Sequence, residues 1–505
     1  MGESVIKFAF IGEALWLAVS ARPSLPKATG QTHEHVLAQS GKRADGRADP
    51  YSRSIVGMKQ PLTIDYNRPT ILDELSVQTV EQARRAGALA VEVGVSAGEG
   101  LAVTVRGGAC ETVEHERDKS LAVTIYLDGR KGTATTSDFS AAALAETVSA
   151  ALRIAEVAEA DQYAGLAAPE FLATSLPDLD LDHPWELDAE AAIALAITCE
   201  RAALGFDTRL KQSDGCSVNR YRGSRAYANS HGFHAAYRGT RHGLSAVMIA
   251  EDDGGMQRGY WYTSSRDPAA LEDAEAVGHA AARRTIAKLG ARKIATTRLP
   301  VIFESHIAGG LLGHVMGAIG GAAQYRRASF LLDALGETIL PEFITVNEEP
   351  HRPGALGSAS FDDDGVATSV KTIIDQGRLN TYLLSAYAAR RLGRTPTGNA
   401  GGVHNLVVSH GPRDLDALIA DFDRALLVTD LMGFGVNGLT GDYSRGASGF
   451  LIERGAIAHA VEEITIAGNL KTMLKDIREI GADVETRGTV HIGSVVIGEM
   501  AVAGS

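Results

Sequence analysis

The sequence contains few cysteines, few aromatic residues and no long apolar run. Its three cysteines, Cys110, Cys199 and Cys216, lie far apart without a CxxC pair. We therefore expect neither a disulfide framework nor a cysteine zinc site, and a reducing cytoplasm is the simplest location. No uncharged apolar run of about 18 residues occurs, so no membrane span is expected. The net charge of −13 and the absence of long basic runs argue against a nucleic-acid partner.

What is present points to a folded chain with an unusual start. A hydrophobic fraction of 45% over 505 residues is sufficient for sizeable cores. Residues 1–65 differ, because an apolar run interrupted by Glu13 leads into a polar stretch without periodicity. We predict that 1–65 is a disordered extension or a mis-called start, with a secretory signal and an extra helix as alternatives. The folded region is expected to begin near residue 65.

The next part of the chain predicts two units of similar order. Residues 66–165 are predicted to form an N-terminal α+β domain, with a helix over 76–90, then alternating strands, then a helix capped by Ser140. After a proline-containing linker, residues 180–290 are predicted to form a central α+β domain of the same order. The tandem helix–strands–helix units share a pattern, not a residue repeat.

Residues 295–503 have a different character and predict a β-rich C-terminal domain. Short alternating segments and glycine turns dominate, and "FLIERGAIAHAV" indicates a hairpin around Arg454-Gly455. The segment "LLGHVMGAIGG" (311–321) predicts a helix packed on a strand, with His314 as its only potential metal ligand. The overall fold class is therefore α+β.

The residues alone indicate no complete catalytic site. A serine triad is not evident, and no P-loop occurs. The strand-like spacing of His231 and His234 would turn them to opposite faces, which disfavours a shared metal ion. "GDYSRGASGF" (441–450) is either a tight β-turn or bulge, or a lining that a peptide can approach, where Arg445 would offer charge-assisted hydrogen bonds.

From about residue 70 onward the chain resembles the TldD/PmbA family, also called modulator-of-gyrase proteins, in its PmbA (TldE) branch. The resemblance rests on motifs in order, including "LPDLDLDHPWELD", "ANSHGF", "FLLDALGETILP", "PTGNAGGVHN", "GDYSRGASGF", "EEITIAGNL" and "HIGSVVIGEM". It implies a cytoplasmic, heteromeric zinc protease that acts on peptides and unfolded segments. We expect the substrate-binding candidates to be the motif residues Tyr443, Ser444, Arg445, His404 and Asn405.

The resemblance also implies where the zinc site of the TldD branch would fall. That branch carries an HExxxH helix and a later cysteine, in which the histidines bind zinc and the glutamate acts as general base. The corresponding positions here are Gly313, His314, Ala318 and, for the cysteine, Ile492. Three of these residues supply no ligand, so we expect no catalytic residue, no metal and no cofactor in this chain. Zinc is expected in a TldD-type partner.

The expected function is that of a non-catalytic subunit of such a protease. Its partners would be a TldD-type catalytic subunit and a peptide or unfolded protein, with no nucleic acid and no membrane; a homodimer is an option for the isolated chain. One alternative is an active metallopeptidase with a non-standard site, using His231, His242 or His404. The other is a peptide-binding regulatory protein, for instance in topoisomerase control.

Overall fold

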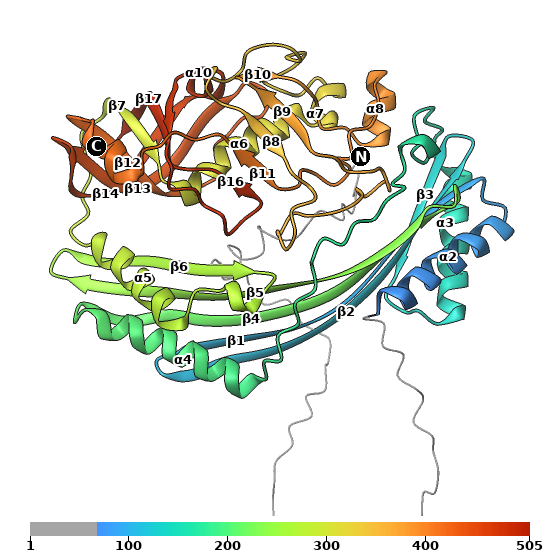
Figure 1. Cartoon of the computed structure of the whole chain (residues 1–505), viewed down its shortest axis with the longest axis horizontal. Helices are drawn as coiled ribbons and strands as arrows, with labels where there is room; N and C mark the ends of the chain where they lie inside the picture. Colours follow the sequence, from blue (N-terminus) through green and yellow to red (C-terminus); the bar gives the residue numbers. More distant parts are fainter. Residues whose placement is uncertain (1–67, 505) are drawn as a thin grey trace, which may run out of the picture. The chain divides into compact units, whose positions relative to one another are not determined.

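The computed structural model describes residues 68–504 (Figure 1). The predicted extension over 1–65 lies outside these residues. In the part that is described, no helix is long and apolar enough to cross a membrane. Helices alternate with strands in the first half and strands dominate the second half, which confirms the α+β class and the β-rich C-terminal region.

The first half consists of two helix–strands–helix units, as predicted. The first unit comprises α2 (Pro69–Arg85), β1 (Ala90–Arg106), β2 (Ala109–Leu127), β3 (Arg130–Thr136) and α3 (Ala141–Val157). The second comprises α4 (Ala189–Phe206), β4 (Leu210–Asn229), β5 (His234–Asp252), β6 (Gly255–Ser265) and α5 (Ala274–Ala287). Helix α2 starts earlier than the predicted residue 76, because Pro69 is well suited to the first helical position.

The strands of both units join in one antiparallel sheet. Its order is β3-β2-β1-β4-β5-β6, so the first strand of each unit lies at the centre. Strands β1 and β4 pair along most of their length, from Glu92 opposite Asn229 to Val105 opposite Cys216. Figure 1 shows these long strands running past both helix pairs, with α2 and α3 at one end and α4 and α5 at the other. The strands predicted for 66–165 and 180–290 are thus parts of a single sheet.

Each long strand contributes to two separate hydrophobic cores. The core under α2 and α3 contains Val93 from β1 and Ala226 from β4. The core under α4 and α5 contains Val103 from β1 and Val218 from β4. Neither unit therefore builds a core from its own residues alone, and the apolar surface of each helix pair is buried only when both units are present.

The linker between the units is fastened to the central strands. The carboxylate of Asp182 accepts hydrogen bonds from Arg222 at 2.7 and 2.8 Å and from Arg238 at 2.7 Å. Further along, Arg220 donates to the backbone carbonyl of Leu187 at 2.8 Å. A carboxylate between two guanidinium groups forms strong charge-assisted hydrogen bonds, so this linker is part of the folded unit.

The C-terminal region contains two sheets. One is six-stranded, in the order β14-β13-β12-β7-β17-β15 with an added β14–β17 pairing, and the other is five-stranded, in the order β10-β9-β8-β11-β16. The strands are β7 (Thr297–Phe303), β8 (Val346–Glu348), β9 (Lys371–Asp375), β10 (Arg378–Leu379), β11 (Leu406–Val408), β12 (Arg424–Met432), β13 (Asp442–Glu453), β14 (Ala456–Asn469), β15 (Ile477–Ile480), β16 (Val490–His491) and β17 (Val495–Ala503). The helices are α6 (Ser305–Ile319), α7 (Gly321–Tyr325), α8 (Ala386–Leu392), α9 (Leu415–Ala420) and α10 (Leu470–Lys475).

Ion pairs and hydrogen bonds join the N-terminal sheet to the C-terminal region. Arg284 on α5 forms two hydrogen bonds of 2.7 Å to the carboxylate of Glu304, the residue before α6. Although burial alone would raise the pKa of Glu304, the bonds from Arg284 and His306 lower it to about 2. Directly after β6, Arg266 forms a further contact by donating hydrogen bonds to the backbone carbonyls of Ala355 and Leu356. The start of α6 is therefore held in place by the N-terminal half.

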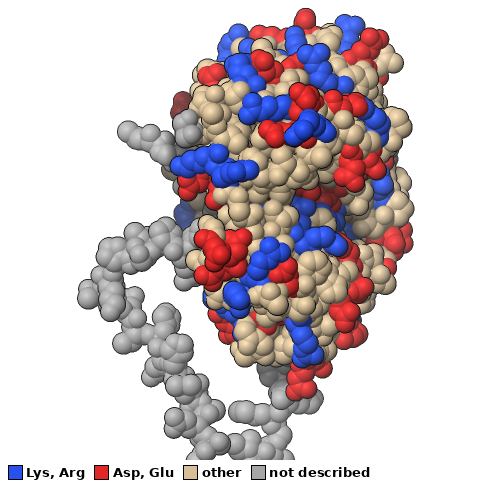
Figure 2. Space-filling view, turned by 90° about the vertical axis from the view of Figure 1, so that its left-hand side faces the viewer, with Lys and Arg blue, Asp and Glu red and all other residues tan. Residues whose placement is uncertain are grey.

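Figure 2 shows the charges on one face of the molecule. Acidic and basic side chains are interspersed there, with apolar and uncharged residues between them.

Candidate functional site

Helix α6 has two different faces. Leu311, Leu312 and Val315 are buried in the main C-terminal core, whereas Gly313 and Gly317 are exposed. Residues three and four apart lie on the same side of a helix, so the buried residues and the glycines separate onto different faces. A Cβ atom added at either glycine would meet no other atom within 4 Å. The glycine face is therefore open.

The open face of α6 is one wall of a pocket of about 310 Å³. That volume lies at the lower end of the range of ligand sites. The other walls come from the 326–330 segment, the loop between β12 and β13, and β13 itself. The lining residues are Gly313, His314, Gly317, Ala318, Ala328, Phe330, Gly433, Phe434, Val436, Gly438 and Arg445. Three of the four positions that correspond to the zinc motif, Gly313, His314 and Ala318, thus line one pocket.

Two polar atoms beside this pocket have no hydrogen-bond partner within residues 68–504. They are the Nε of Arg445 and the hydroxyl of Tyr443, both buried from solvent. The two residues are two positions apart on β13 and so lie on the same side of the strand. The Tyr443 ring meets the His314 ring edge to face, with 6.1 Å between the centroids. Unpaired buried polar atoms are uncommon and call for an explanation.

At neutral pH the charge of the pocket comes from Arg445. Burial lowers the pKa of His314, and the neighbouring positive charge of Arg445 lowers it further, so the imidazole is neutral. Burial raises the pKa of Tyr443 to about 12, although Arg445 acts in the opposite direction, so the phenol keeps its proton. No aspartate or glutamate is among the lining residues. The pocket therefore combines one guanidinium with apolar walls.

The residues of this pocket do not fit a zinc ion. Zinc sites use three or four ligands drawn from histidine, cysteine and carboxylate side chains, and this pocket offers one imidazole, that of His314. Arg445 has no lone pair to donate and would repel a dication. Across residues 68–504, no group of three or more histidine, cysteine, aspartate or glutamate side chains is placed to hold a metal ion.

The fourth zinc-motif position lies elsewhere. Ile492 is 4% exposed and lines a small apolar void together with Leu311 and Leu312, on the buried side of α6. It is not among the residues of the open pocket. The structure thus brings Gly313, His314 and Ala318 together but places Ile492 in the core.

The substrate-binding candidates on β13 divide between the two sides of the strand. Tyr443 is buried and Arg445 half-buried beside the pocket, whereas Ser444 is exposed. Successive side chains of a strand point to opposite faces, so Ser444 is directed away from the pocket side. Of the three, only Arg445 lines the pocket directly.

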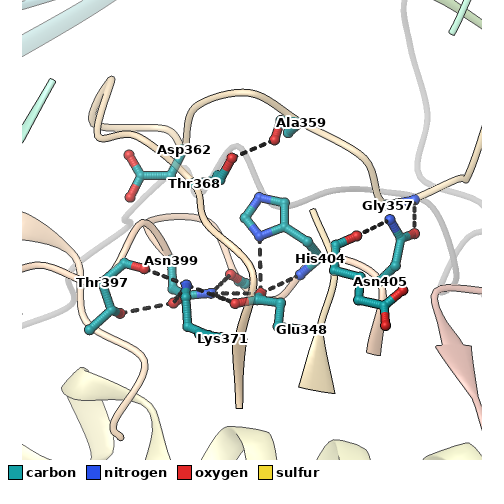
Figure 3. Close-up of polar contacts among 12 residues, drawn as sticks. Glu348, Gly357, Ala359, Asp362, Thr368, Lys371, Thr397, Asn399, His404 and Asn405 are labelled. Atoms are coloured by element: carbon teal, nitrogen blue, oxygen red, sulfur yellow. Dashed lines mark hydrogen bonds and ion pairs between the residues drawn. The ribbon is translucent and has the colours of Figure 1, made fainter. Parts of the chain in front are cut away.

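The other two candidates, His404 and Asn405, belong to a separate buried network around Glu348 (Figure 3). Glu348 ends β8 and is fully buried. Its carboxylate accepts hydrogen bonds from the backbone N–H of His404 at 2.7 Å and from Asn399 at 2.9 Å. It also pairs with the His404 ring at 3.0 Å and with Lys371, the first residue of β9, at 2.8 Å. The network therefore joins the ends of neighbouring strands.

The partners of Glu348 keep it ionised. Burial alone would raise its pKa, but the hydrogen bond from His404 and the charge of Lys371 lower the pKa to about 2. Asn405 is equally committed to internal bonds. Its side chain accepts from the backbone N–H of Gly357 at 2.9 Å and donates to Ser358 at 2.8 Å. The side chains of Glu348, His404 and Asn405 are therefore engaged in hydrogen bonds within the protein.

Sequence reasoning missed Glu348, Lys371 and Asn399. The only sequence signal for the first two is a charged residue next to a short apolar stretch, as in "TVNEE" and "SVKTIID". Such a charge is usually solvated, and only the fold shows that these two meet in the interior.

The histidines considered for a non-standard metal site each have their own partners. His231 is bonded to the carbonyl of Ala167 at 3.0 Å, and His242 to the carbonyl of His183 at 2.8 Å. His404 is bonded to Glu348. The three do not form a cluster among the described residues.

Comparison with protein families matches almost the whole described chain. Residues 91–155, 182–289 and 296–504 match the models described as PmbA/TldA metallopeptidase domain 1, central domain and C-terminal domain. The metalloprotease PmbA of Escherichia coli O157:H7 is 45% identical over 434 residues, covering 86% of this chain and 96% of that protein. A PmbA homolog from Haemophilus influenzae is 41% identical, covering 84% and 94% of the two chains.

Solved structures have the same fold. A protein described as a modulator of DNA gyrase from Bacteroides thetaiotaomicron matches with a TM-score of 0.81 at 29% identity, covering 86% of this chain and 98% of that one. TldE from Thermococcus kodakarensis matches with a TM-score of 0.76 at 20% identity, covering 85% and 100%. At that identity the second match concerns the fold alone.

Proposed function

Because this chain belongs to the PmbA/TldD metallopeptidase family, we propose that it is the TldE-type subunit of a two-component zinc protease. In this role it binds peptides or unfolded segments and supports a TldD-type catalytic chain, which carries the zinc. It has no metal and no cofactor of its own. The free thiols of Cys199 and Cys216, both buried, fit a reducing cytoplasm as its location.

The single observation that carries this proposal is the composition of the pocket at α6. Gly313 and Ala318 provide no ligand, and the guanidinium of Arg445 stands where a dication would be repelled. Without a bound metal ion, nothing in this pocket lowers the pKa of a water from about 15.7 toward 7 to create a nucleophile. A pocket of this kind can bind a peptide but lacks the group that would hydrolyse it.

The loop between β12 and β13 supports a role in contacting another chain. In this loop Phe434 is 100% exposed and Leu439 is 56% exposed, and Met432, the last residue of β12, is 53% exposed. Large apolar side chains gathered on one exposed loop are typical of surfaces that bind other proteins. Since Phe434 also lines the α6 pocket, a partner bound to this loop would lie next to a bound peptide.

The test uses the full chain together with a TldD-type chain from the same cell. We expect the two to elute as one complex in size-exclusion chromatography with light scattering, burying more than about 1,000 Å². Elemental analysis should find zinc in the complex but far less than one zinc per isolated chain. Peptide cleavage should require the complex and stop when a chelator is added. Cleavage by this chain alone, or stoichiometric zinc in it, would favour an active metallopeptidase instead.

A matched pair of variants tests the loop. We expect Phe434→Ser to weaken the complex at least about tenfold, because it removes a large apolar contact. Val157→Ser removes another exposed apolar side chain, 85% exposed at the end of α3, and should leave the affinity unchanged. Equal affinities for both variants would exclude this loop from the interface. Peptide binding without any complex formation would favour a regulatory peptide-binding protein.

A further inference from the structure

The α6 pocket presents a single cation among apolar and glycine walls. Of its lining residues, only His314 and Arg445 carry ionisable groups, and Arg445 bears the charge at neutral pH. Its Nε atom is buried without a hydrogen-bond partner in the described part of the chain. A buried donor on a charged group is costly to leave unpaired. Since Arg445 lines the pocket and no carboxylate of the protein does, an anion from outside the chain can pair with this guanidinium.

We infer that the α6 pocket binds the C-terminal carboxylate of a peptide whose last side chain is apolar. The inference rests on the proposed function, in which this chain binds peptides, and it specifies which part of the peptide is recognised. Arg445 would form the charge-assisted hydrogen bonds to the carboxylate. The terminal side chain would contact Phe330, Phe434 and Val436.

The charge of the pocket favours a carboxylate. A guanidinium matches a carboxylate geometrically, because two parallel N–H groups can bond its two oxygens. Phosphate groups are usually held by clusters of basic residues, whereas Arg445 is the only lysine or arginine in this lining. A single negative charge therefore suits the single positive charge of the site.

The walls and the volume favour a chain end. About 310 Å³ is small for a ligand site and leaves room for about one or two amino-acid residues. Added Cβ atoms at Gly313, Gly317, Gly433 and Gly438 would meet nothing within 4 Å, so the space between the walls is free of protein atoms. A terminal residue presents its carboxylate and its side chain from the same Cα atom, so both can reach a cation and an apolar wall in so small a pocket.

The experiment compares three short fluorescent peptides by anisotropy with the full chain. The first ends in Ala-Ala-Phe with a free carboxylate, the second is the same peptide with a C-terminal amide, and the third is an amide with Asp in place of the middle Ala. We expect the free acid to bind at least about tenfold more tightly than either amide. Tight binding of the third peptide would show that an internal carboxylate suffices, which would overturn the inference of a chain end.

Variants assign the effect to the pocket. Arg445→Gln should abolish the preference for the free acid, whereas Arg424→Gln, which removes the same charge from an exposed position on β12, should retain it. Gly317→Leu should weaken binding of the free acid by filling the pocket without changing its charge. Unchanged melting temperatures would confirm that the variants are folded.

The outcomes also separate this inference from the proposed function. If acid and amide bind equally, or if the preference survives Arg445→Gln, the carboxylate site is refuted while peptide binding by a TldE-type subunit stands. If none of the peptides binds but the complex with the TldD-type chain forms and cleaves them, the carboxylate site is also refuted. Loss of both peptide binding and complex formation would refute the proposed function itself.

Discussion

Replacing Glu348 with glutamine should destabilise the protein markedly at neutral pH. The carboxylate is fully buried and lies 2.8 Å from the ammonium group of Lys371 and 3.0 Å from the His404 ring. Glutamine has nearly the same shape but no charge, so it leaves the positive charge of Lys371 unpaired, and its amide would place an N–H₂ group against these donors. Breaking a buried ion pair in this way typically costs about 3–5 kcal/mol.

The pKa of Glu348 gives an independent magnitude. Its lowering from 4.5 to about 2 corresponds to about 3 kcal/mol of stability, at about 1.36 kcal/mol per pKa unit. Because the pKa in the folded state is depressed, this stability is fully present above pH 4.5 and is lost as the pH falls toward 2. At pH 3.5, about 2 kcal/mol should remain.

The assay is urea unfolding followed by circular dichroism at pH 7 and pH 3.5, for the wild type, Glu348→Gln and Glu342→Gln. Glu342 is exposed in the same region, so its substitution should change the free energy of unfolding by less than about 0.5 kcal/mol. The difference between the wild type and Glu348→Gln should be about 3 kcal/mol at pH 7 and smaller at pH 3.5. A loss below about 1 kcal/mol, or the same loss at both pH values, would refute the assignment of a charged, paired carboxylate.

Two further predictions concern a glycine pair and the half-buried carboxylate of Glu92. Gly317→Ala should raise the free energy of unfolding by about 0.5–1 kcal/mol, because this position in α6 is open and alanine is the better helix former. Gly278→Ala in α5 should lower the free energy of unfolding, because the added Cβ would lie 2.3 Å from the carbonyl oxygen of Cys199. The two variants are compared by thermal unfolding. The opposite order of stability would show that the space around these glycines does not control their effect. Burial and the neighbouring Asp364 raise the pKa of Glu92, so its charged form costs stability at high pH and this cost disappears as the pH falls through the raised pKa. The free energy of unfolding of Glu92→Gln, relative to that of the wild type, should therefore be higher at pH 8 than at pH 5. A difference between variant and wild type that is the same at both pH values would refute the raised pKa.

Local features of the fold could be predicted from the sequence because they depend on neighbouring residues. Ser140 caps α3 by accepting a hydrogen bond from the backbone N–H of Ala143, as its position before an apolar helical repeat predicted. Arg454-Gly455 forms the turn between β13 and β14, and both residues have positive φ values, 51° and 75°. The helix predicted at 311–321 corresponds to α6, which begins earlier, at Ser305, and ends at Ile319.

The composition of the α6 pocket was also determined largely by the sequence. Family motifs placed Gly313, His314 and Ala318 at the zinc positions, and residue identity alone decides that glycine and alanine supply no ligand. That these three positions and Arg445 face one cavity depended on the tertiary structure, because α6 and β13 are far apart in the chain. The sequence grouped His404 and Asn405 with Arg445, and the structure separates them into a different, buried network.

The union of the two helix–strands–helix units in one sheet was decided only by the tertiary structure. Local periodicity identifies each strand, but it does not say that Val105 pairs with Cys216 or that both helix pairs cover parts of the same strands. The same holds for Glu348 and Lys371, whose charges would be solvated on isolated strands. Which residues pair across long sequence distances is set by the burial of apolar surface and by the closing of long loops, and neither is encoded within a few consecutive residues.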